Sequence, residues 1–304
     1  MNLRDLDYIC AVAEHKHFGR AADACHVSQP TLSGQIKKLE EQLGVTLFER
    51  GHKGIRVTDI GTEIIQIARE ARDAANRIRA VAASAQDPLA GTLSLGLIPT
   101  IAPYLIPLFV GRMSDGLPNL SVTYREDITE RLTDGLLTGE LDAAVLATPP
   151  EEDSLTAITL YTEPFWLVFP EGHDLQNMTS IHMADVKDED ILLLTEGHCF
   201  RDQALSICRP ESRKRKQSLR ATSLETLINL VATGQGVTLV PALAMRDGRI
   251  ADLGLRSQKL LDSGAAREIY LTYRKQFPRQ ALVKAIGALI QSGLPDSVAR
   301  RALS

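Results

Sequence analysis

The stretch His17–Arg50, "HFGRAADACHVSQPTLSGQIKKLEEQLGVTLFER", decides the fold of the N-terminal part of the chain. It predicts one helix over about 18–25, a turn at 26–28, and a second helix that begins after Ser28. Serine is a favourable N-cap, and Pro30 is tolerated in a first turn because its missing N–H would have no intrahelical partner. Apolar residues then recur at steps of four, three and four, which predicts a buried stripe at Leu32, Ile36, Leu39 and Leu43.

The face opposite this stripe carries small and polar side chains and lysine. At 100° per residue it contains Pro30, Ser33, Gly34 and Lys37, flanked by Thr31 and Lys38. Such a surface fits the major groove of DNA. The glycine-bounded basic stretch "RGHKGIRVT" (50–58) predicts a hairpin wing that contacts the phosphate backbone. Periodicity alone leaves an ordinary helical hairpin with a solvated outer face as the alternative.

The segments 21–50 and 57–65 ("VTDIGTEII") carry a resemblance to a known family. The paired alanines, Ser-Gln-Pro, I-x-x-L-E, L-G-x-x-L-F-x-R and T-x-x-G resemble the winged helix-turn-helix of LysR-type transcriptional regulators. Many members of that family have arginine at the position of Gly34. The resemblance and the exposed face together predict DNA contacts at Gln29, Pro30, Thr31, Ser33, Lys37, Arg50 and Lys53.

A long helix is predicted over 58–85, which contains no proline. Its apolar residues alternate at steps of four and three, at Ile60, Ile64, Ile67, Ala71, Ala74, Ile78 and Val81. This heptad seam predicts a dimer contact, made in particular by Ile60, Ile64, Ile67, Ala71 and Ile78. A dimer would let two helix-turn-helix units read two half-sites. The stretch "SAQDPLAG" (84–91) would end the helix in a hinge.

The remainder of the chain alternates strands and helices from residue 92 onward, which predicts an α/β fold with open parallel sheets. Ligands gather at the carboxyl ends of strands in such sheets, here the loops 98–100 and 196–199. This part resembles the two-lobed, periplasmic-binding-protein-like effector domain of the LysR family. The predicted boundaries are a DNA-binding domain at 1–58, a dimerisation helix at 59–87 and a regulatory domain at 88–304. We place lobe I at about 88–161 and 268–304, and lobe II at about 162–267.

Two of the four cysteines lie in "EGHCFRDQALSIC" (196–208). We expect Cys199 at or near the first turn of a helix, where His198, Arg201 and a distant arginine could complete an electropositive pocket that favours the thiolate. If 199–208 were helical, the two cysteine Cα atoms would be about 13 Å apart. A disulfide needs roughly 4.4–6.8 Å, so Cys199 and Cys208 could join only after unwinding. Inert core cysteines, a zinc site that includes His198, and a true peroxidase remain as alternatives.

Three segments are similar to the peroxide-sensing OxyR type of LysR regulator: "GLIPTIAPYLIP" (96–107), "EGHCFRDQALSIC" (196–208) and "RATSLETLINLVATGQGVTLVPALA" (220–244). The resemblance implies that Cys199 reacts with peroxide and that Cys208 resolves it in a reversible disulfide. It also implies a peroxide pocket of Thr100, Thr129, His198 and Arg267. The basic run 209–221 departs from the family, and a solvated charged loop is its simplest interpretation.

Composition limits the class of protein. The 304 residues are 44% hydrophobic and 24% charged, and no apolar run reaches the roughly 18 residues that span a bilayer. The first residues lack a secretory signal, so we expect a cytoplasmic protein, in which four cysteines form no disulfide framework. Cys10, Cys25 and Trp166 are interpreted as core residues. No cofactor, metal or membrane contact is expected.

The sequence thus predicts a regulator that is not an enzyme and that activates transcription from a homodimer or homotetramer on double-stranded DNA. Hydrogen peroxide is its expected signal, with RNA polymerase and a thiol reductase as further partners. Two alternatives stay open: a LysR-type regulator that responds to a small organic effector, and a thiol peroxidase.

Overall fold

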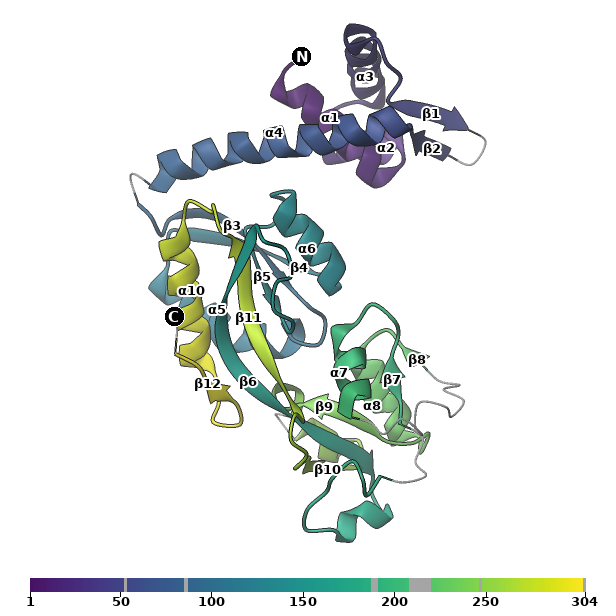
Figure 1. The fold of residues 1–304 in the computed structure, drawn as a ribbon, viewed down its shortest axis with the longest axis vertical. Coiled ribbons are helices and arrows are strands. Elements are labelled where there is room, and N and C mark those ends of the chain that lie inside the picture. Colours follow the sequence, from purple (N-terminus) through teal and green to yellow (C-terminus); the bar gives the residue numbers. More distant parts are fainter. Residues whose placement is uncertain (52–53, 85–86, 187–190, 208–219, 246–247, 303–304) are drawn as a thin grey trace. The chain divides into compact units, whose positions relative to one another are not determined.

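The computed structural model describes residues 1–51, 54–84, 87–186, 191–207, 220–245 and 248–302 (Figure 1). Its internal contacts divide the chain into two compact units. One comprises Met1–Ala82 with Thr138–Glu140, and the other comprises Ala83–Leu137 with Leu141–Ser304. We call the first the head unit and the second the regulatory unit, and describe each by itself.

Three short helices form the head unit: α1 (Leu3–His15), α2 (Phe18–Ala24) and α3 (Gln29–Leu43). Each begins at a side-chain cap, because the first N–H groups of a helix lack intrahelical acceptors. Asn2 and Asp5 form a capping box on α1, the His17 ring accepts from two amides of α2, and Ser28 accepts from Thr31 N. The predicted helices, the turn and the Ser28 cap are confirmed.

The core of the head unit lies between these helices. Leu32, Ile36 and Leu39 are buried as the periodicity predicts, whereas Leu43 is 38% exposed at the end of α3. Cys10 is buried as well, and Cys25 packs partly buried against this core. A two-stranded antiparallel wing follows, β1 (Phe48–Gly51) and β2 (Gly54–Val57). The Glu40 carboxylate ties α3 to the wing by accepting from Leu47 N and Phe48 N at 2.7 and 3.1 Å.

The long helix α4 (Asp59–Ser84) begins and ends within one residue of its predicted bounds. Ile65 and Ala68 are buried in the head core, and Ile64 and Ala71 are partly buried against it. Other residues of the predicted seam are exposed, among them Ile67 at 64% and Ile78 at 72%. In a single chain, α4 therefore has one face on its own unit and an apolar face without cover from that unit.

The regulatory unit is built on an eight-stranded sheet in the order β10-β6-β11-β5-β3-β4, with β9 and β12 paired to β6. Its main strands are β3 (Gly91–Leu97), β4 (Leu120–Glu126), β5 (Ala143–Leu146), β6 (Leu155–Pro170) and β11 (Ala266–Arg274). The shorter strands are β9 (Thr238–Pro241), β10 (Leu255–Lys259) and β12 (Ala299–Arg300). The predicted α/β class is confirmed, but the expectation of parallel sheets is wrong in part. Within the described part of this sheet, β3 alone pairs in parallel, with β4 and β5, whereas β11 pairs antiparallel with β5 and β6, and β10, β9 and β12 pair antiparallel with β6.

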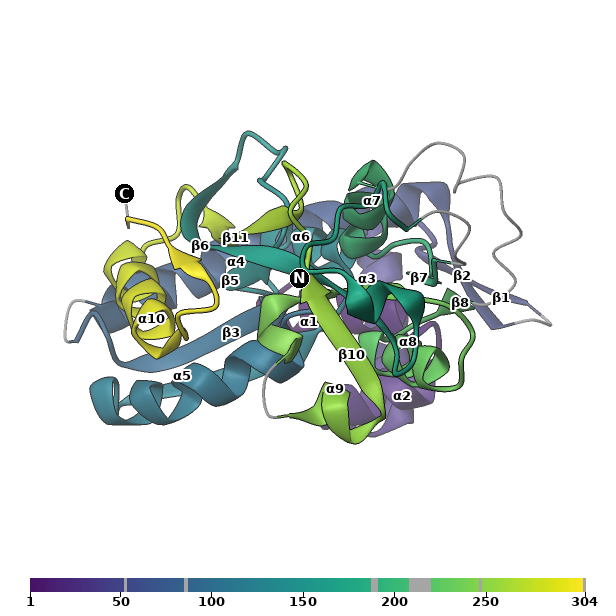
Figure 2. The same cartoon turned by 90° about the horizontal axis from the view of Figure 1, so that it is seen from below.

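Helices cover this sheet. Helix α5 (Ala102–Gly116) packs against α10 (Gln280–Gly293), as Figures 1 and 2 show. Helix α6 (Thr129–Leu137) follows β4, and its Leu132 lies over Gly96, where a Cβ would approach the leucine to 2.8 Å. Trp166 packs partly buried against the core of this part, consistent with its interpretation as a core residue.

A second hydrophobic core lies at the other end of β6 and includes Phe165, Leu167, Phe200 and Leu239. The elements around it are η1 (Asp174–Asn177), β7 (Leu193–Leu194), α7 (Cys199–Ile207), β8 (Arg220–Ala221), α8 (Leu224–Ala232), η3 (Ala242–Met245) and α9 (Arg249–Asp252). Strand β6 contributes residues to both cores and so connects the two lobes, and β11 pairs with it along the first core. In the part of the chain that the structure describes, no helix is both long and apolar enough to cross a bilayer.

Candidate functional site

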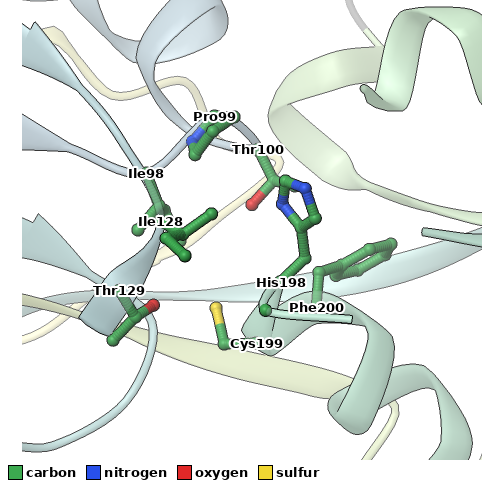
Figure 3. Close-up of a pocket in the computed structure, with 9 residues that line it drawn as sticks. Ile98, Pro99, Thr100, Ile128, Thr129, His198, Cys199 and Phe200 are labelled. Atoms are coloured by element: carbon green, nitrogen blue, oxygen red, sulfur yellow. The ribbon is translucent and has the colours of Figure 1, made fainter. Parts of the chain in front are cut away.

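Three loops of the regulatory unit meet at a small pocket with an empty volume of about 170 Å³ (Figure 3). The loop after β3 contributes residues 98–100, the start of α6 contributes 128–129, and the start of α7 contributes 197–200. Much of this space is open to solvent, and its enclosed part, about 10 Å³, has room for roughly one water-sized molecule, so the pocket suits only a very small ligand. The two loops that the sequence singled out, 98–100 and 196–199, are thus brought together.

Cys199 is the first residue of α7, as predicted. Gly197 turns the chain into the helix with φ of +92°, a conformation that favours glycine because it has no Cβ. The N–H groups of a first helical turn have no intrahelical acceptors and favour negative charge nearby. The Cys199 sulfur is turned toward the pocket in Figure 3. It therefore lies at the N-terminal end of α7 and faces the pocket, where it could meet a small reactant.

Two groups of the expected electropositive pocket, His198 and Arg201, do not supply free charge. Burial lowers the pKa of His198 from its ordinary value of 6.5, so the ring is mainly neutral at pH 7. Arg201 does not line the pocket, and its guanidinium pairs with Glu196 at 3.8 Å and Asp202 at 3.4 Å. The prediction of an electropositive pocket is wrong on this point, since Arg201 is already compensated. His198 can act as a hydrogen-bonding group instead.

Two threonine hydroxyls stand in the pocket wall. The Thr129 hydroxyl oxygen is buried and has no hydrogen-bond partner among the described residues. The Thr100 hydroxyl accepts from Arg267 Nη1 at 2.8 Å, and the Thr100 carbonyl accepts from Arg267 Nη2 at 3.0 Å. Figure 3 shows Thr100 and His198 among the residues that line the pocket. A small polar molecule beside Cys199 would thus have several hydrogen-bond partners.

Arg267 lies behind the pocket rather than in its lining. Its guanidinium carbon is 5.3 Å from the centroid of the Phe200 ring, and its Nε donates to Glu163 Oε2 at 2.9 Å. The side chains of Arg267 and Glu163 are each only 1% exposed. Sequence reasoning missed Glu163, although a lone carboxylate in the apolar run "TEPFWLVF" was a signal for a buried partner.

A larger cleft also reaches Cys199, with a volume of about 450 Å³. Thr129, Gly197 and Cys199 are shared with the small pocket. The described lining contains no lysine, arginine or histidine, but it holds five carboxylates, at Glu130, Asp134, Glu151, Glu152 and Asp202. Cys199 therefore lies between a small, largely neutral pocket and an acidic cleft.

The remaining cysteines differ from Cys199 in their surroundings. Burial raises the pKa of both the Cys10 and the Cys25 thiols, so both stay protonated near neutral pH. Cys208 lies outside the described residues, as does the basic segment 209–216. Among the described residues, no group of three or more His, Cys, Asp or Glu side chains could hold a metal ion.

The expected DNA-contacting face lies on α3 of the head unit. Gln29, Pro30, Thr31 and Lys37 are exposed there, and Ser33 is half-buried. Arg50 is in β1, but its side chain and the whole of Lys53 lie outside the described residues. The structure thus presents the polar face of α3 to solvent, with the wing after it.

Both units match known protein-family models. Residues 3–62 match the model of the bacterial regulatory helix-turn-helix protein, lysR family, and residues 86–295 match the LysR substrate binding domain. The chain belongs to the LysR family. Both the predicted family and the predicted fold class are confirmed, and the members of this family are transcription regulators.

Several members of the LysR family are similar to this chain over its length. The DNA-binding transcriptional dual regulator OxyR of Escherichia coli K12 is 39% identical over 306 residues, which cover 100% of both chains. The hydrogen peroxide-inducible genes activator of Dickeya chrysanthemi is 41% identical over 91% of both chains.

Solved LysR-family structures show the same similarity. A full-length OxyR of Pseudomonas aeruginosa with a cysteine-to-aspartate substitution has a TM-score of 0.76 at 36% identity, covering 96% of this chain and 98% of that one. A hydrogen-peroxide-bound cysteine-to-serine variant of OxyR from Corynebacterium glutamicum has a TM-score of 0.64 at 33% identity, with 96% and 92% covered.

Proposed function

We propose that this chain is a peroxide-responsive transcriptional regulator whose Cys199 is the sensing thiol. The observation that carries the proposal is the position of that thiol. It lies at the first residue of α7, in a pocket of about 170 Å³ lined also by Thr100, Thr129 and His198. Relatives that span the whole chain are named for hydrogen peroxide, and one solved relative holds it bound. These names support the chemistry that the pocket suggests.

The first step is a displacement at peroxide oxygen. The Cys199 thiolate attacks one oxygen of HOOH, the S–O bond forms, the O–O bond breaks, and hydroxide leaves and takes a proton to become water. The sulfur is oxidised to sulfenic acid and the peroxide is reduced. The Thr100, Thr129 and His198 side chains hold the peroxide by hydrogen bonds and neutralise charge on the leaving oxygen.

The second step joins two sulfurs. The Cys208 thiol attacks the sulfur of the Cys199 sulfenic acid, the S–S bond forms, and the hydroxyl leaves as water. Helix α7 spans Cys199–Ile207, and nine helical residues separate their ends by too much for a disulfide bond. The helix must therefore unwind before the bond closes, which converts a chemical event into a conformational one. A thiol reductase would reverse it.

We assign DNA binding to the head unit and dimerisation to α4. The proposed DNA contacts are Gln29, Pro30, Thr31, Ser33, Lys37, Arg50 and Lys53. The proposed dimer contacts are the heptad residues Ile60, Ile64, Ile67, Ala71 and Ile78. The assembly is a dimer, and further a tetramer, on two-fold DNA half-sites, acting as an activator with RNA polymerase in the cytoplasm. Arg50→Ala should weaken binding to all DNA sequences and flatten its salt dependence.

The test of the sensing thiol is the oxidation rate of each cysteine in the intact chain at low peroxide, followed by mass mapping. Cys199 should react fastest, and Cys199→Ser should form no 199–208 disulfide. Cys208→Ser should still lose its Cys199 thiol but stop at sulfenic or sulfinic acid. Cys10→Ala and Cys25→Ala are matched controls, because burial raises the pKa of both thiols. Equal rates at Cys199 and Cys10 would refute the proposal.

A second candidate function rests on the cleft of about 450 Å³ beside Cys199. It is large enough for a small organic effector, and its five carboxylates would select a cationic or neutral one. Calorimetric titration of Cys199→Ser with small amines would detect such a ligand. Tight binding together with an unreactive Cys199 in the unaltered chain would favour this candidate over peroxide sensing.

A further inference from the structure

Glu163 lies in β6 and contributes nothing to the pocket lining, yet it is fully buried. Both of its carboxylate oxygens are used as acceptors. Oε1 accepts from Leu243 N at 2.7 Å, and Oε2 accepts from Arg267 Nε at 2.9 Å while lying 2.9 Å from Arg267 Nη2. Since Arg267 is equally buried, this carboxylate compensates its charge out of contact with water.

Arg267 carries the effect from Glu163 to the pocket. Its Nη1 donates to the Thr100 hydroxyl at 2.8 Å, and its Nη2 donates to the Thr100 carbonyl at 3.0 Å. An arginine has five N–H donors and no acceptor. The Thr100 hydroxyl can therefore only accept from Arg267, which leaves its own proton free to be donated elsewhere.

We infer that Glu163 is a positioning residue, which acts through Arg267 to fix the Thr100 hydroxyl as a hydrogen-bond donor to the oxidant at Cys199. The inference rests on the proposed peroxide-sensing function. A donor at this point would stabilise the oxygen that leaves as the O–O bond breaks. The Phe200 ring, 5.3 Å from the guanidinium, closes the remaining side of Arg267 and belongs to the same turn as Cys199.

The substitution E163Q isolates the two acceptor oxygens with little change of shape. A glutamine offers one acceptor oxygen and one donor NH₂. Either Leu243 N or Arg267 would then face a donor instead of an acceptor, and Arg267 would lose its compensating charge. The guanidinium would no longer be held against Thr100.

The experiment compares two reagents at Cys199 in the full chain. Hydrogen peroxide needs the donor, whereas iodoacetamide alkylates the thiol without it. We expect E163Q to slow peroxide oxidation of Cys199 about tenfold, which is the effect of one lost hydrogen bond. The rate of alkylation should change less than about twofold. E163D keeps both acceptor oxygens and should recover part of the loss. The matched control is Glu171→Gln, which removes a carboxylate from an exposed pair with Arg256 and should leave both rates unchanged.

A double-mutant cycle with Thr100→Val tests the route. If Glu163 acts through the Thr100 hydroxyl, E163Q should add almost no further slowing once that hydroxyl is gone. Parallel loss of both reagent rates in E163Q, or full additivity in the cycle, would overturn the role of Glu163. If E163Q oxidised at Cys199 as fast as the unaltered chain, the role of Glu163 would also be overturned, but the proposed function would stand. A peroxide rate at Cys199 of the unaltered chain no higher than that of Cys10 would overturn the proposed function itself.

Discussion

The chemistry of the pocket depends on a few single residues around the start of α7. Cys199 stands at a helix start, His198 is half-buried beside it, and Gly197 provides the left-handed turn between β7 and α7. All three are neighbours in sequence, and for that reason the sequence predicts their local arrangement. Glu163 and Arg267 are 104 residues apart, and no local pattern announces such a pair.

The lowered pKa of His198 has a measurable consequence for stability. Burial holds its pKa below 6.5 in the folded chain, so protonation favours the unfolded chain. The contribution of the neutral ring to stability is present above pH 6.5 and is lost as the pH falls through the folded-state pKa. Between pH 7.5 and 5.5, the unaltered chain should therefore lose more unfolding free energy than His198→Asn, whose side chain does not titrate. Urea unfolding at both pH values measures this, and equal losses would contradict it.

Gly61, the glycine of the T-x-x-G motif, is predicted to tolerate no side chain. A Cβ there would lie 2.5 Å from the Leu47 carbonyl oxygen and 2.8 Å from Thr58 Oγ1. Gly61→Ala should destabilise the head unit by about 1–3 kcal/mol through this overpacking. The loss of stability can be measured as faster hydrogen exchange of the backbone amides in peptides from α1–α3, which belong to the head unit alone. Gly34→Ala is the control, because nothing lies within 4 Å of its added Cβ. Equal protection in the two variants would contradict the clash.

At the scale of elements, the helices are predictable and the strands less so. The bounds of α3 and α4 follow from caps and apolar periodicity, which act within one segment. Strand β6 runs over Leu155–Pro170 without a break, although Pro164 within it has no N–H to donate to a neighbouring strand. The strand continues since Pro164 pairs with Ala266 at one end of β11, and that pairing is invisible in the sequence. The antiparallel part of the sheet was missed for the same reason.

A hydrogen bond joins helix α7 to the neighbouring lobe: Gln203 Nε2 donates to the Ala147 carbonyl at 2.7 Å. In the proposed mechanism, α7 unwinds before the disulfide between Cys199 and Cys208 closes. Gln203→Ala should therefore speed disulfide closure about fivefold, the effect of one lost hydrogen bond, and leave sulfenic acid formation unchanged. Stopped-flow oxidation with rapid alkylation separates the two steps.

Ser206→Ala is the matched control for this step. Among the described residues, the Ser206 hydroxyl bonds only to the Gln203 carbonyl within α7 and joins the helix to no other element. Its loss should leave closure within about twofold of the original rate. Closure that is no faster in Gln203→Ala than in Ser206→Ala would remove the role assigned to the interlobe bond.

The exposed face of α4 predicts which substitutions separate dimerisation from folding. Ile67 and Ile78 are 64% and 72% exposed in one chain, so Ile67→Asp with Ile78→Asp should leave the head unit folded. Burying an unpaired polar group in an apolar seam costs about 2–7 kcal/mol of association free energy. The dimer should therefore dissociate. Sedimentation equilibrium and operator affinity measure this. Ile65→Asp, at a site only 4% exposed, should instead unfold the head unit. An unchanged mass for the Ile67 and Ile78 variant would refute the contact.

At the scale of the whole chain, charge is distributed unevenly around a net value of −4. Five Lys or Arg against three Glu over 28–56 make the helix-turn-helix region positive, which suits a phosphate backbone. The cleft beside Cys199 has the opposite sign, with five carboxylates and no basic residue in its described lining. The sequence predicts the positive charge of the helix-turn-helix region because the charged residues of that region are close together in the sequence. The negative charge of the cleft comes from segments near 130, 151 and 202, which only the folded chain brings together.

The acidic cleft should select neutral oxidants over anionic ones. Hydrogen peroxide is neutral, whereas peroxymonosulfate carries a negative charge that Glu151, Glu152 and their neighbours repel as it approaches Cys199. Salt shortens the Debye length from about 30 Å at 0.01 M to about 3 Å at 1 M. Over this range the rate of Cys199 oxidation by peroxymonosulfate should rise several-fold, and the rate with hydrogen peroxide should change less than about twofold.

The Cys199 thiolate itself also repels an anionic oxidant. The double variant Glu151→Gln with Glu152→Gln therefore measures how much of the repulsion comes from the carboxylates of the cleft. It should react faster with peroxymonosulfate at low salt and show a flatter salt dependence, while its rate with hydrogen peroxide stays unchanged. Glu171→Gln removes one carboxylate that does not line the cleft and should keep the original dependence. Stopped-flow measurement of thiol loss with both oxidants gives all the slopes. Identical salt slopes for peroxymonosulfate in the double variant and the unaltered chain would mean that the oxidant reaches Cys199 without passing these carboxylates.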